Sequence, residues 1–143
     1  MICSKVFKKK FVKVKKGKIF CRVGGKGPPL LLLHGYPQTH IMWHKTANEL
    51  SKSFTIIAAD LRGYGSSLVL KSDNKHINYS KREMAKDMVQ MMDKLGFKKF
   101  FIAGHDRGGR VAHRLARDHR KKVIAMSVLD ICPTLDMYEK TEK

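Results

Sequence analysis

The stretch AGHDRGGR, residues 103–110, places Asp106 between two glycines, after an apolar run and before an expected helix. A sharp strand-to-helix turn of this kind presents the side chain at its tip, and Gly104 and Gly108 leave room for strand and helix to approach closely. Backbone N–H groups at the helix N-terminus face a negative charge there. A carboxylate so placed can displace a leaving group from a saturated carbon and form an ester. The stretch therefore predicts covalent chemistry at Asp106, followed by hydrolysis of that ester.

The segments around this turn alternate between apolar runs and helical patterns. Residues 7–14 and 17–25 alternate loosely around a KKG turn, which predicts a hairpin with a lysine-rich face. Continuous apolar runs predict strands buried on both faces, at 30–35, 54–60, 98–104 and 123–131. Helices are expected at 39–52, 79–96 and 107–120, and a glycine-rich loop at 61–67. Buried strands that alternate with helices indicate one α/β domain with a mostly parallel sheet.

The helix expected at 79–96 has the clearest boundaries. Ser80 is a candidate N-cap with Glu83 three residues on, and Gly96 is a stop signal. Four methionines and a leucine recur at helical spacing, at positions 84, 88, 91, 92 and 95. A stripe of this kind is typical of a helix face in the core, and we do not interpret it as a cofactor or partner surface.

The charge of the chain is strongly positive. Lysine and arginine number 30 against 12 acidic residues, which gives a net charge of +18. A charge of this size can favour nucleic acid or an anionic surface. Most of the lysines are scattered, however, and no nucleic-acid-binding motif accompanies them. We therefore expect a lysine-rich solvated surface and no nucleic-acid partner.

The remaining composition bounds the location and the cofactors. No apolar run approaches the roughly 20 residues of a membrane helix, and the N-terminus has no signal-peptide pattern. We therefore expect a soluble, cytoplasmic protein without membrane contact. Cys3, Cys21 and Cys132 have neither a metal spacing nor a disulfide framework. They are expected to be free thiols, and no metal or cofactor is predicted.

Four motifs together resemble the α/β-hydrolase fold, in the branch that contains haloalkane dehalogenases, epoxide hydrolases and fluoroacetate (haloacetate) dehalogenases. The motifs are LLLLHGYPQTHIMW (an HGxP loop), AADLRGYGSS (a DxRGxGxS loop), GHDRGGRVAHRLARDH and SVLDICPT. Their order and spacing match the family, and the resemblance covers almost the whole chain. It implies a mostly parallel sheet with helices on both faces, truncated after about the sixth strand. Residues 1–143 would then be the N-terminal portion of one α/β-hydrolase domain.

The resemblance implies a role for individual residues. Asp106 would be the nucleophile, the backbone N–H groups of Tyr36 and Arg107 would form the oxyanion hole, and Asp130 would orient a catalytic histidine. His34 and His105 are expected to be structural. Asp60 and Arg62 are expected to hold the loop that follows their strand.

Two arginines favour one branch of the family. The haloacetate group carries Arg directly after the nucleophile and again three residues later, as Arg107 and Arg110 do here, whereas the other branches commonly carry Trp at the first position. Two guanidinium groups at this spacing can hold a carboxylate bidentately. The resemblance therefore implies a 2-haloacid substrate, with an epoxide hydrolase as the alternative.

The chain also departs from the family pattern. The family has a helical lid after the sixth strand and a catalytic histidine near its end, whereas none of the seven histidines here follows Asp130. The chain could be a fragment, a truncated gene product, or a non-catalytic relic or basic binding module. The run at 123–131 would be an apolar sheet edge prone to association. We therefore expect the isolated chain to lack multiple turnover and to be aggregated, oligomeric or loosely packed.

Overall fold

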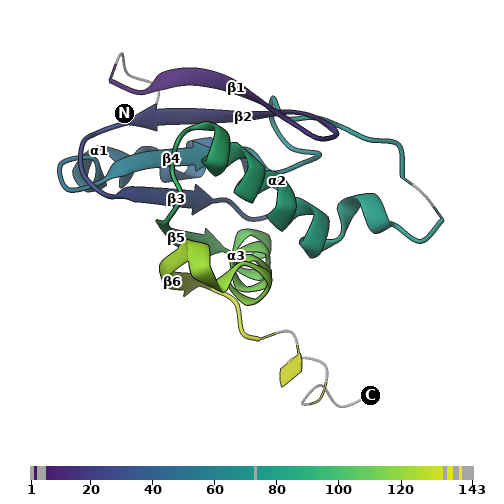
Figure 1. Cartoon of the computed structure of the whole chain (residues 1–143). Helices are drawn as coiled ribbons and strands as arrows, with labels where there is room; N and C mark the ends of the chain where they lie inside the picture. The colour runs from purple at the N-terminus through teal and green to yellow at the C-terminus, as the bar shows by residue number, and fades with distance from the viewer. Residues whose placement is uncertain (1, 3–5, 73, 134, 137–138, 140–143) are drawn as a thin grey trace.

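The computed structural model describes residues 2, 6–72, 74–133, 135–136 and 139. Within these residues the chain forms a sheet whose strand order is β1-β2-β4-β3-β5-β6 (Figure 1). The strands are β1 (Lys8–Val14), β2 (Gly17–Gly24), β3 (Pro29–Leu33), β4 (Thr55–Ala59), β5 (Phe100–His105) and β6 (Val123–Leu129). β1, β2 and β4 pair antiparallel in that order, and β4, β3, β5 and β6 pair parallel. The expected hairpin and mostly parallel sheet are both confirmed.

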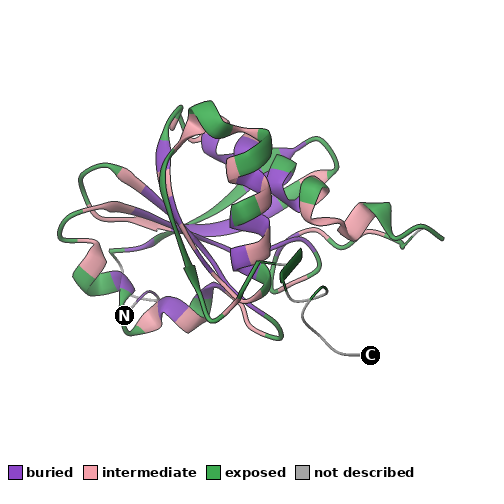
Figure 2. Ribbon diagram, turned by 90° about the horizontal axis from the view of Figure 1, so that it is seen from below, coloured by how far each residue is buried: buried purple, intermediate pink, exposed green. Residues whose placement is uncertain are grey.

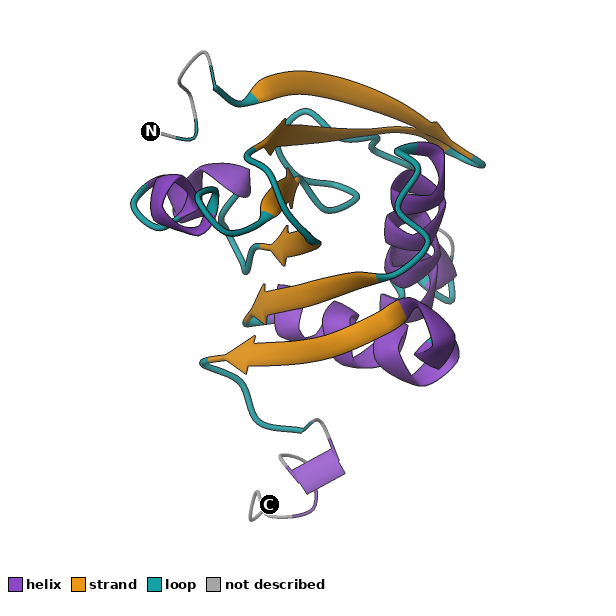
Figure 3. Cartoon of the chain, turned by 60° about the vertical axis from the view of Figure 1, so that its left-hand side comes forward, coloured by secondary structure: helices purple, strands orange, loops and turns teal. Residues whose placement is uncertain are grey.

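Helices lie on both faces of this sheet, as expected. α2 (Lys81–Lys94) and α3 (Arg107–Asp118) cover one face, while the 3-10 helix η1 (His40–His44) and α1 (Ala47–Leu50) lie on the other (Figure 3). Two further 3-10 turns are η2 (Ile77–Tyr79) and η3 (Arg120–Lys122). The larger core lies between the sheet and the α2–α3 layer, and a smaller one lies under η1 and α1.

The methionine-rich helix has the boundaries that its sequence predicts. The Ser80 side chain caps the N-terminus by accepting the backbone N–H of Glu83 at 3.3 Å. Gly96 adopts a φ of 89°, a left-handed conformation that suits glycine, and the Phe97 N–H bonds back to the Met92 carbonyl at 2.9 Å. The four methionines of the stripe are buried. α2 therefore packs through an apolar face, as expected.

The prediction of a single helix at 39–52 is wrong. The structure has η1, a break, and one turn of α1. Asp60 accepts hydrogen bonds from both the backbone N–H and the ring Nδ1 of His40, at 2.7 Å each, which anchors the start of the segment to the end of β4. Thr46 then bonds through its hydroxyl to the Trp43 carbonyl, a local bond that competes with a regular helix.

The expected burial of β6 on both faces is wrong, whereas the apolar sheet edge also expected at 123–131 is present within the described residues. The strand forms in the predicted place, but Val123 is partly buried and every residue from Ile124 to Leu129 is exposed (Figure 2). Apolar strands of α/β sheets become buried because helices cover both faces and strands pair on both sides. Within the described residues β6 pairs with β5 only, and α3 covers it on one face only.

Candidate functional site

Asp106 lies at the tip of the turn between β5 and α3, in a conformation that few non-glycine residues adopt. Its φ is 46° and its ψ is −114°. The glycines on either side permit the turn: a Cβ on Gly104 would lie 2.3 Å from the Gly108 carbonyl oxygen, and a Cβ on Gly108 would lie 2.4 Å from the Leu33 carbonyl oxygen. α3 therefore starts in direct backbone contact with β3 and β5, and this close packing holds the carboxylate at the carboxyl end of the sheet.

Two backbone N–H groups face the Asp106 carboxylate. The Tyr36 N–H, in the loop after β3, donates to Oδ2 at 2.9 Å, and the Arg107 N–H also donates to the carboxylate. Partial burial raises the pKa of Asp106, but these two bonds and the nearby His105 and Arg107 side chains outweigh it, so the pKa lies below the ordinary value. Asp106 is therefore an ionised carboxylate with one oxygen held in place.

The two predicted carboxylate-binding arginines differ in their surroundings. The Arg107 guanidinium donates to the Tyr64 hydroxyl at 3.0 Å and lies over the Tyr36 ring, 4.7 Å from its centroid. Arg110 lies one turn further along α3, is half-buried, and donates its backbone N–H to the Asp106 carbonyl at 3.2 Å. The structure thus brings both arginines to the start of α3, beside Asp106. Tyr64 was missed by sequence reasoning, because a tyrosine in a glycine-rich loop carries no signal of its contacts.

Lys81, the first residue of α2, also approaches this site and was not predicted. Its pKa is lowered by burial and further by the positive charges of Arg107 and Arg110, while Asp106 acts in the opposite direction. Lys81 and Arg107 therefore both interact electrostatically with the Asp106 carboxylate. The position of a lysine at a helix start gives no hint of this, because the approach depends on how α2 packs beside α3.

Asp130, the predicted partner of a catalytic histidine, directly follows β6. Its φ is 53°, its side chain is 88% exposed, and Oδ2 lies 3.5 Å from Nε2 of His105. The histidine in contact with Asp130 is therefore the residue before Asp106, which sequence reasoning treats as structural. The predicted orienting role of Asp130 stays a prediction.

The loop after β4 is held by side chains that lie close to the site. Asp60 accepts the backbone N–H of Ser66 at 3.0 Å, as expected for a loop anchor. Burial lowers the pKa of His34. The neutral ring bonds through Nδ1 to the Gly35 carbonyl at 2.8 Å and accepts the Leu61 N–H at Nε2, at 2.9 Å. This ring therefore joins the loop after β3 to the loop after β4, in agreement with its expected structural role.

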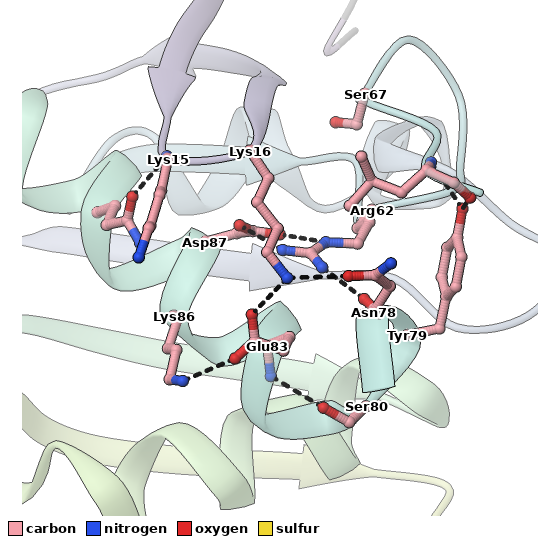
Figure 4. Close-up of polar contacts among 12 residues, drawn as sticks. Lys15, Lys16, Arg62, Ser67, Asn78, Tyr79, Ser80, Glu83, Lys86 and Asp87 are labelled. Atoms are coloured by element: carbon pink, nitrogen blue, oxygen red, sulfur yellow. Dashed lines mark hydrogen bonds and ion pairs between the residues drawn. The ribbon is translucent and has the colours of Figure 1, made fainter. Parts of the chain in front are cut away.

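A buried ion pair connects the same loop to α2. Arg62 donates two bonds of 2.8 Å to the Asp87 carboxylate, and both side chains are 2% exposed or less. Arg62 also donates to the Asn78 carbonyl (Figure 4). Around this pair Lys16, in the hairpin turn, bonds to Glu83 of α2 at 3.1 Å. The predicted anchoring role of Arg62 is confirmed, and its partners lie in α2 and η2.

Other kinds of site find no support in the described part of the chain. No group of three or more His, Cys, Asp or Glu side chains is arranged there to hold a metal ion. None of the helices described is long and apolar enough to cross a membrane. Cys21 is buried and Cys132 is exposed, both as free thiols, whereas Cys3 lies outside the described residues.

Comparison with known proteins shows the family to which the chain belongs. Residues 28–142 match the model of the alpha/beta hydrolase fold, and the chain belongs to this family. It is 47% identical over 137 residues to a fluoroacetate dehalogenase from Burkholderia sp., covering 96% of this chain and 45% of that protein. It is 40% identical over 111 residues to a soluble epoxide hydrolase from Corynebacterium sp. (strain C12), covering 78% and 37%.

Solved structures agree with this family membership. A crystal structure from Nostoc sp. PCC 7120, whose name places it among the alpha/beta hydrolases, superposes with a TM-score of 0.95 at 52% identity. That alignment covers 100% of this chain and 48% of the other. The chain thus spans about half the length of the relatives it matches, and it corresponds to their N-terminal half.

Proposed function

We propose that this chain supplies the nucleophile-bearing half of a haloacetate dehalogenase, in which Asp106 sits on a nucleophile elbow. The observation that carries the proposal is the carboxylate itself: an ionised Asp106 on a strained turn, with one oxygen held by the Tyr36 N–H. The 47% identity to a fluoroacetate dehalogenase supports the substrate class. Arg107 and Arg110, beside Asp106, suit a substrate that carries its own carboxylate.

The geometry suggests which oxygen attacks. Oδ2 of Asp106 is bound by the Tyr36 N–H, so Oδ1 is the oxygen available to donate its electron pair to the α-carbon of the haloacid. The carbon–halogen bond breaks, and the halide leaves with the bonding electrons. Oδ2 then becomes the carbonyl oxygen of the ester, held by the Tyr36 N–H. That N–H and the Arg107 N–H would stabilise the oxyanion that forms when water attacks the ester, and one such donor contributes about 3 kcal/mol.

The second step needs a base to take a proton from water, after which the ester C–O bond breaks to release the hydroxyacid. The predicted histidine for this step would follow Asp130, and this chain has none there. We therefore expect the 143-residue chain to form the ester at most once per molecule. Asp130 is proposed to orient a base supplied by the other half of the domain.

Mass spectrometry after incubation with chloroacetate tests the first step. We expect one carboxymethyl group on the peptide that contains Asp106, and none in Asp106→Asn. Thiols are blocked beforehand, because Cys132 is exposed. Sustained halide release by the isolated chain, or a modification only at other residues, would contradict the proposal. The latter result would favour a non-catalytic relic or a basic binding module.

Substrate choice is tested separately, in an assembly completed with a C-terminal half. Arg107→Ala and Arg110→Ala should each raise KM for haloacetates about tenfold or more, because a charge-assisted hydrogen bond contributes about 1.5–3 kcal/mol. Arg117→Ala is the matched control, an exposed arginine on the same helix. Faster turnover of epoxides than of haloacetates would favour the alternative, an epoxide hydrolase, which the Corynebacterium relative supports.

Two further proposals concern the location of the chain and its association. A cytoplasmic location is supported by the free Cys21 and Cys132 thiols, since disulfides follow oxidising compartments. Association of isolated chains through the sheet edge is supported by the exposed apolar side chains of β6. Cell fractionation and light scattering test these two proposals.

A further inference from the structure

The Arg107 side chain is exposed, yet it is held at two points. Its Nη1 donates to the Tyr64 hydroxyl at 3.0 Å, and its guanidinium carbon lies 4.7 Å from the centroid of the Tyr36 ring. An exposed arginine ordinarily samples many rotamers and loses that freedom when it binds a ligand. Here one nitrogen and one face of the guanidinium are already engaged, whereas these two contacts use neither the Nε nor the Nη2 donors.

Tyr64 is itself held from several sides. Its backbone N–H donates to the Leu61 carbonyl at 3.0 Å, and its carbonyl accepts the Ser67 N–H at 3.1 Å. Its ring meets the buried His34 ring edge to face, with the centroids 5.0 Å apart and an interplanar angle of 70°. The His34 ring is in turn bonded to the loops after β3 and β4. The Tyr64 hydroxyl therefore offers Arg107 an acceptor in a fixed place.

Tyr36 connects this arrangement to the nucleophile. Its backbone N–H donates to Oδ2 of Asp106 at 2.9 Å, while its ring lies against the Arg107 guanidinium. A cation over an aromatic face is attracted by the ring. The reacting carboxylate and the neighbouring cation are therefore both placed against the same tyrosine, and the bond to Tyr64 limits the rotation that the Arg107 side chain would otherwise keep.

We propose that Tyr64 is a positioning residue that holds the Arg107 guanidinium ready for the carboxylate of the substrate, with the Tyr36 ring as a second support. This inference deepens the proposed function and rests on it. Because Arg107 is ordered before the substrate arrives, binding does not have to order it, and affinity rises accordingly. The remaining donors of Arg107 then fix the direction from which a carboxylate, and the α-carbon attached to it, approaches Asp106. Tyr64 thus favours haloacids over neutral halides without contacting the reacting carbon.

The first test compares two reagents that differ in charge. The full 143-residue chain, with its thiols blocked, is incubated with chloroacetate or with neutral chloroacetamide, and mass spectrometry follows the peptide that contains Asp106. With either reagent an Asp106 oxygen bonds to the CH₂ carbon and chloride leaves with the bonding electrons. At reagent concentrations below saturation, Tyr64→Phe should slow the reaction with chloroacetate about three- to tenfold and that with chloroacetamide less than about twofold, because only chloroacetate needs an ordered Arg107.

A tyrosine in the same region supplies the matched control. Tyr79 lies against Gly63, next to Tyr64 in the chain, and its hydroxyl donates to the Leu70 carbonyl at 2.7 Å. Tyr79→Phe therefore removes a hydroxyl from the same loop region and should leave the ratio of the two rates unchanged. Tyr36→Leu removes the second support and should lower the ratio as Tyr64→Phe does. Equal slowing with both reagents in Tyr64→Phe, no slowing with chloroacetate, or the same change in Tyr79→Phe would overturn the proposal.

The mobility of the Arg107 side chain gives a readout that does not need the reaction. In ¹⁵N relaxation of the Nε groups without any ligand, the order parameter of Arg107 should lie above about 0.6 in the unmodified chain and below it in Tyr64→Phe, since values under about 0.6 mark flexible groups. Arg117, exposed on the same helix, serves as the mobile reference. An Arg107 that is already as mobile as Arg117 in the unmodified chain would overturn the proposal.

The two readouts separate this proposal from the proposed function. If neither reagent modifies Asp106, the proposed function fails, while an ordered Arg107 that becomes mobile in Tyr64→Phe still upholds its positioning by Tyr64. If chloroacetate modifies Asp106 equally fast in Tyr64→Phe and in the unmodified chain, the proposed function stands and the positioning role fails.

Discussion

Two adjacent glycines at the start of α3 should respond to different extents to the same substitution. A Cβ on Gly108 would lie 2.4 Å from the Leu33 carbonyl oxygen and 2.6 Å from the His34 carbonyl oxygen, so the backbones of α3 and β3 would have to separate. A Cβ on Gly109 would lie 2.6 Å from Cγ2 of Ile131, the end of a flexible side chain, and 3.1 Å from the Gly104 carbonyl oxygen. Only the first contact requires the main chain to move.

The magnitudes follow from these contacts. Alanine is favoured over glycine within a helix by about 1 kcal/mol, and this gain applies equally to both positions. Overpacking costs about 1–3 kcal/mol, and more where the backbone must move. We therefore expect Gly108→Ala to lower the free energy of unfolding by about 2 kcal/mol and Gly109→Ala to change it by less than about 1 kcal/mol. Urea unfolding followed by far-ultraviolet circular dichroism measures both.

The same shift should reach the site. Moving α3 away from β3 lengthens the contact between Asp106 and the Tyr36 N–H, so alkylation of Asp106 by chloroacetate should slow in Gly108→Ala and stay near the unmodified rate in Gly109→Ala. The shared helix makes each variant a control for the other. If Gly108→Ala proved as stable as Gly109→Ala, the close backbone approach would not be what holds the turn, and the reasoning would fail.

Three further predictions concern charge. The folded pKa of Asp106 lies below its ordinary value of about 4. The contribution of this carboxylate to stability is therefore complete above pH ~4 and is lost as the pH falls through the folded pKa. The rate of Asp106 alkylation should be constant across about pH 5–8, and a rise in rate over that range would contradict this. Asp87→Asn leaves Arg62 buried with a weakened partner and should cost about 3–5 kcal/mol in urea unfolding, while a loss under 1 kcal/mol would refute the role of the pair. N-ethylmaleimide at pH 8 should label Cys132 and spare Cys21, because burial raises the pKa of the Cys21 thiol to about 12; equal labelling would show that the core opens.

Sequence reasoning succeeded where local patterns decide the structure. Four strands follow from apolar runs and the two strands of the hairpin from alternation, and the boundaries of α2 follow from Ser80 and Gly96, whose effects reach only the adjacent turn. The placement of Asp106 in a turn of positive φ follows from the two glycines that flank it. Each of these features depends on residues within a few positions of one another.

The parts that were missed depend on contacts between distant segments. η1 separates from α1 while His40 is bound by Asp60, twenty residues away, and no periodicity in 39–52 reveals that bond. Tyr64 and Lys81 reach the site because a loop and a helix start fold beside α3.

The order of strands in the sheet also sets the order in which edges appear during synthesis. β4 pairs on one side of β3, β5 is then added on the other side of β3, and β6 is added beside β5, so β5 and then β6 form the open edge of the growing sheet. A strand and its crossover helix take about 30 residues, and ribosomes add about 5–20 residues per second. Each new apolar edge therefore stays bare for about 1.5–6 seconds before the next strand can cover it. Chaperones that bind extended apolar segments would bind this chain at β5 and β6. The lysine-rich β1, which is made first, would bind them weakly.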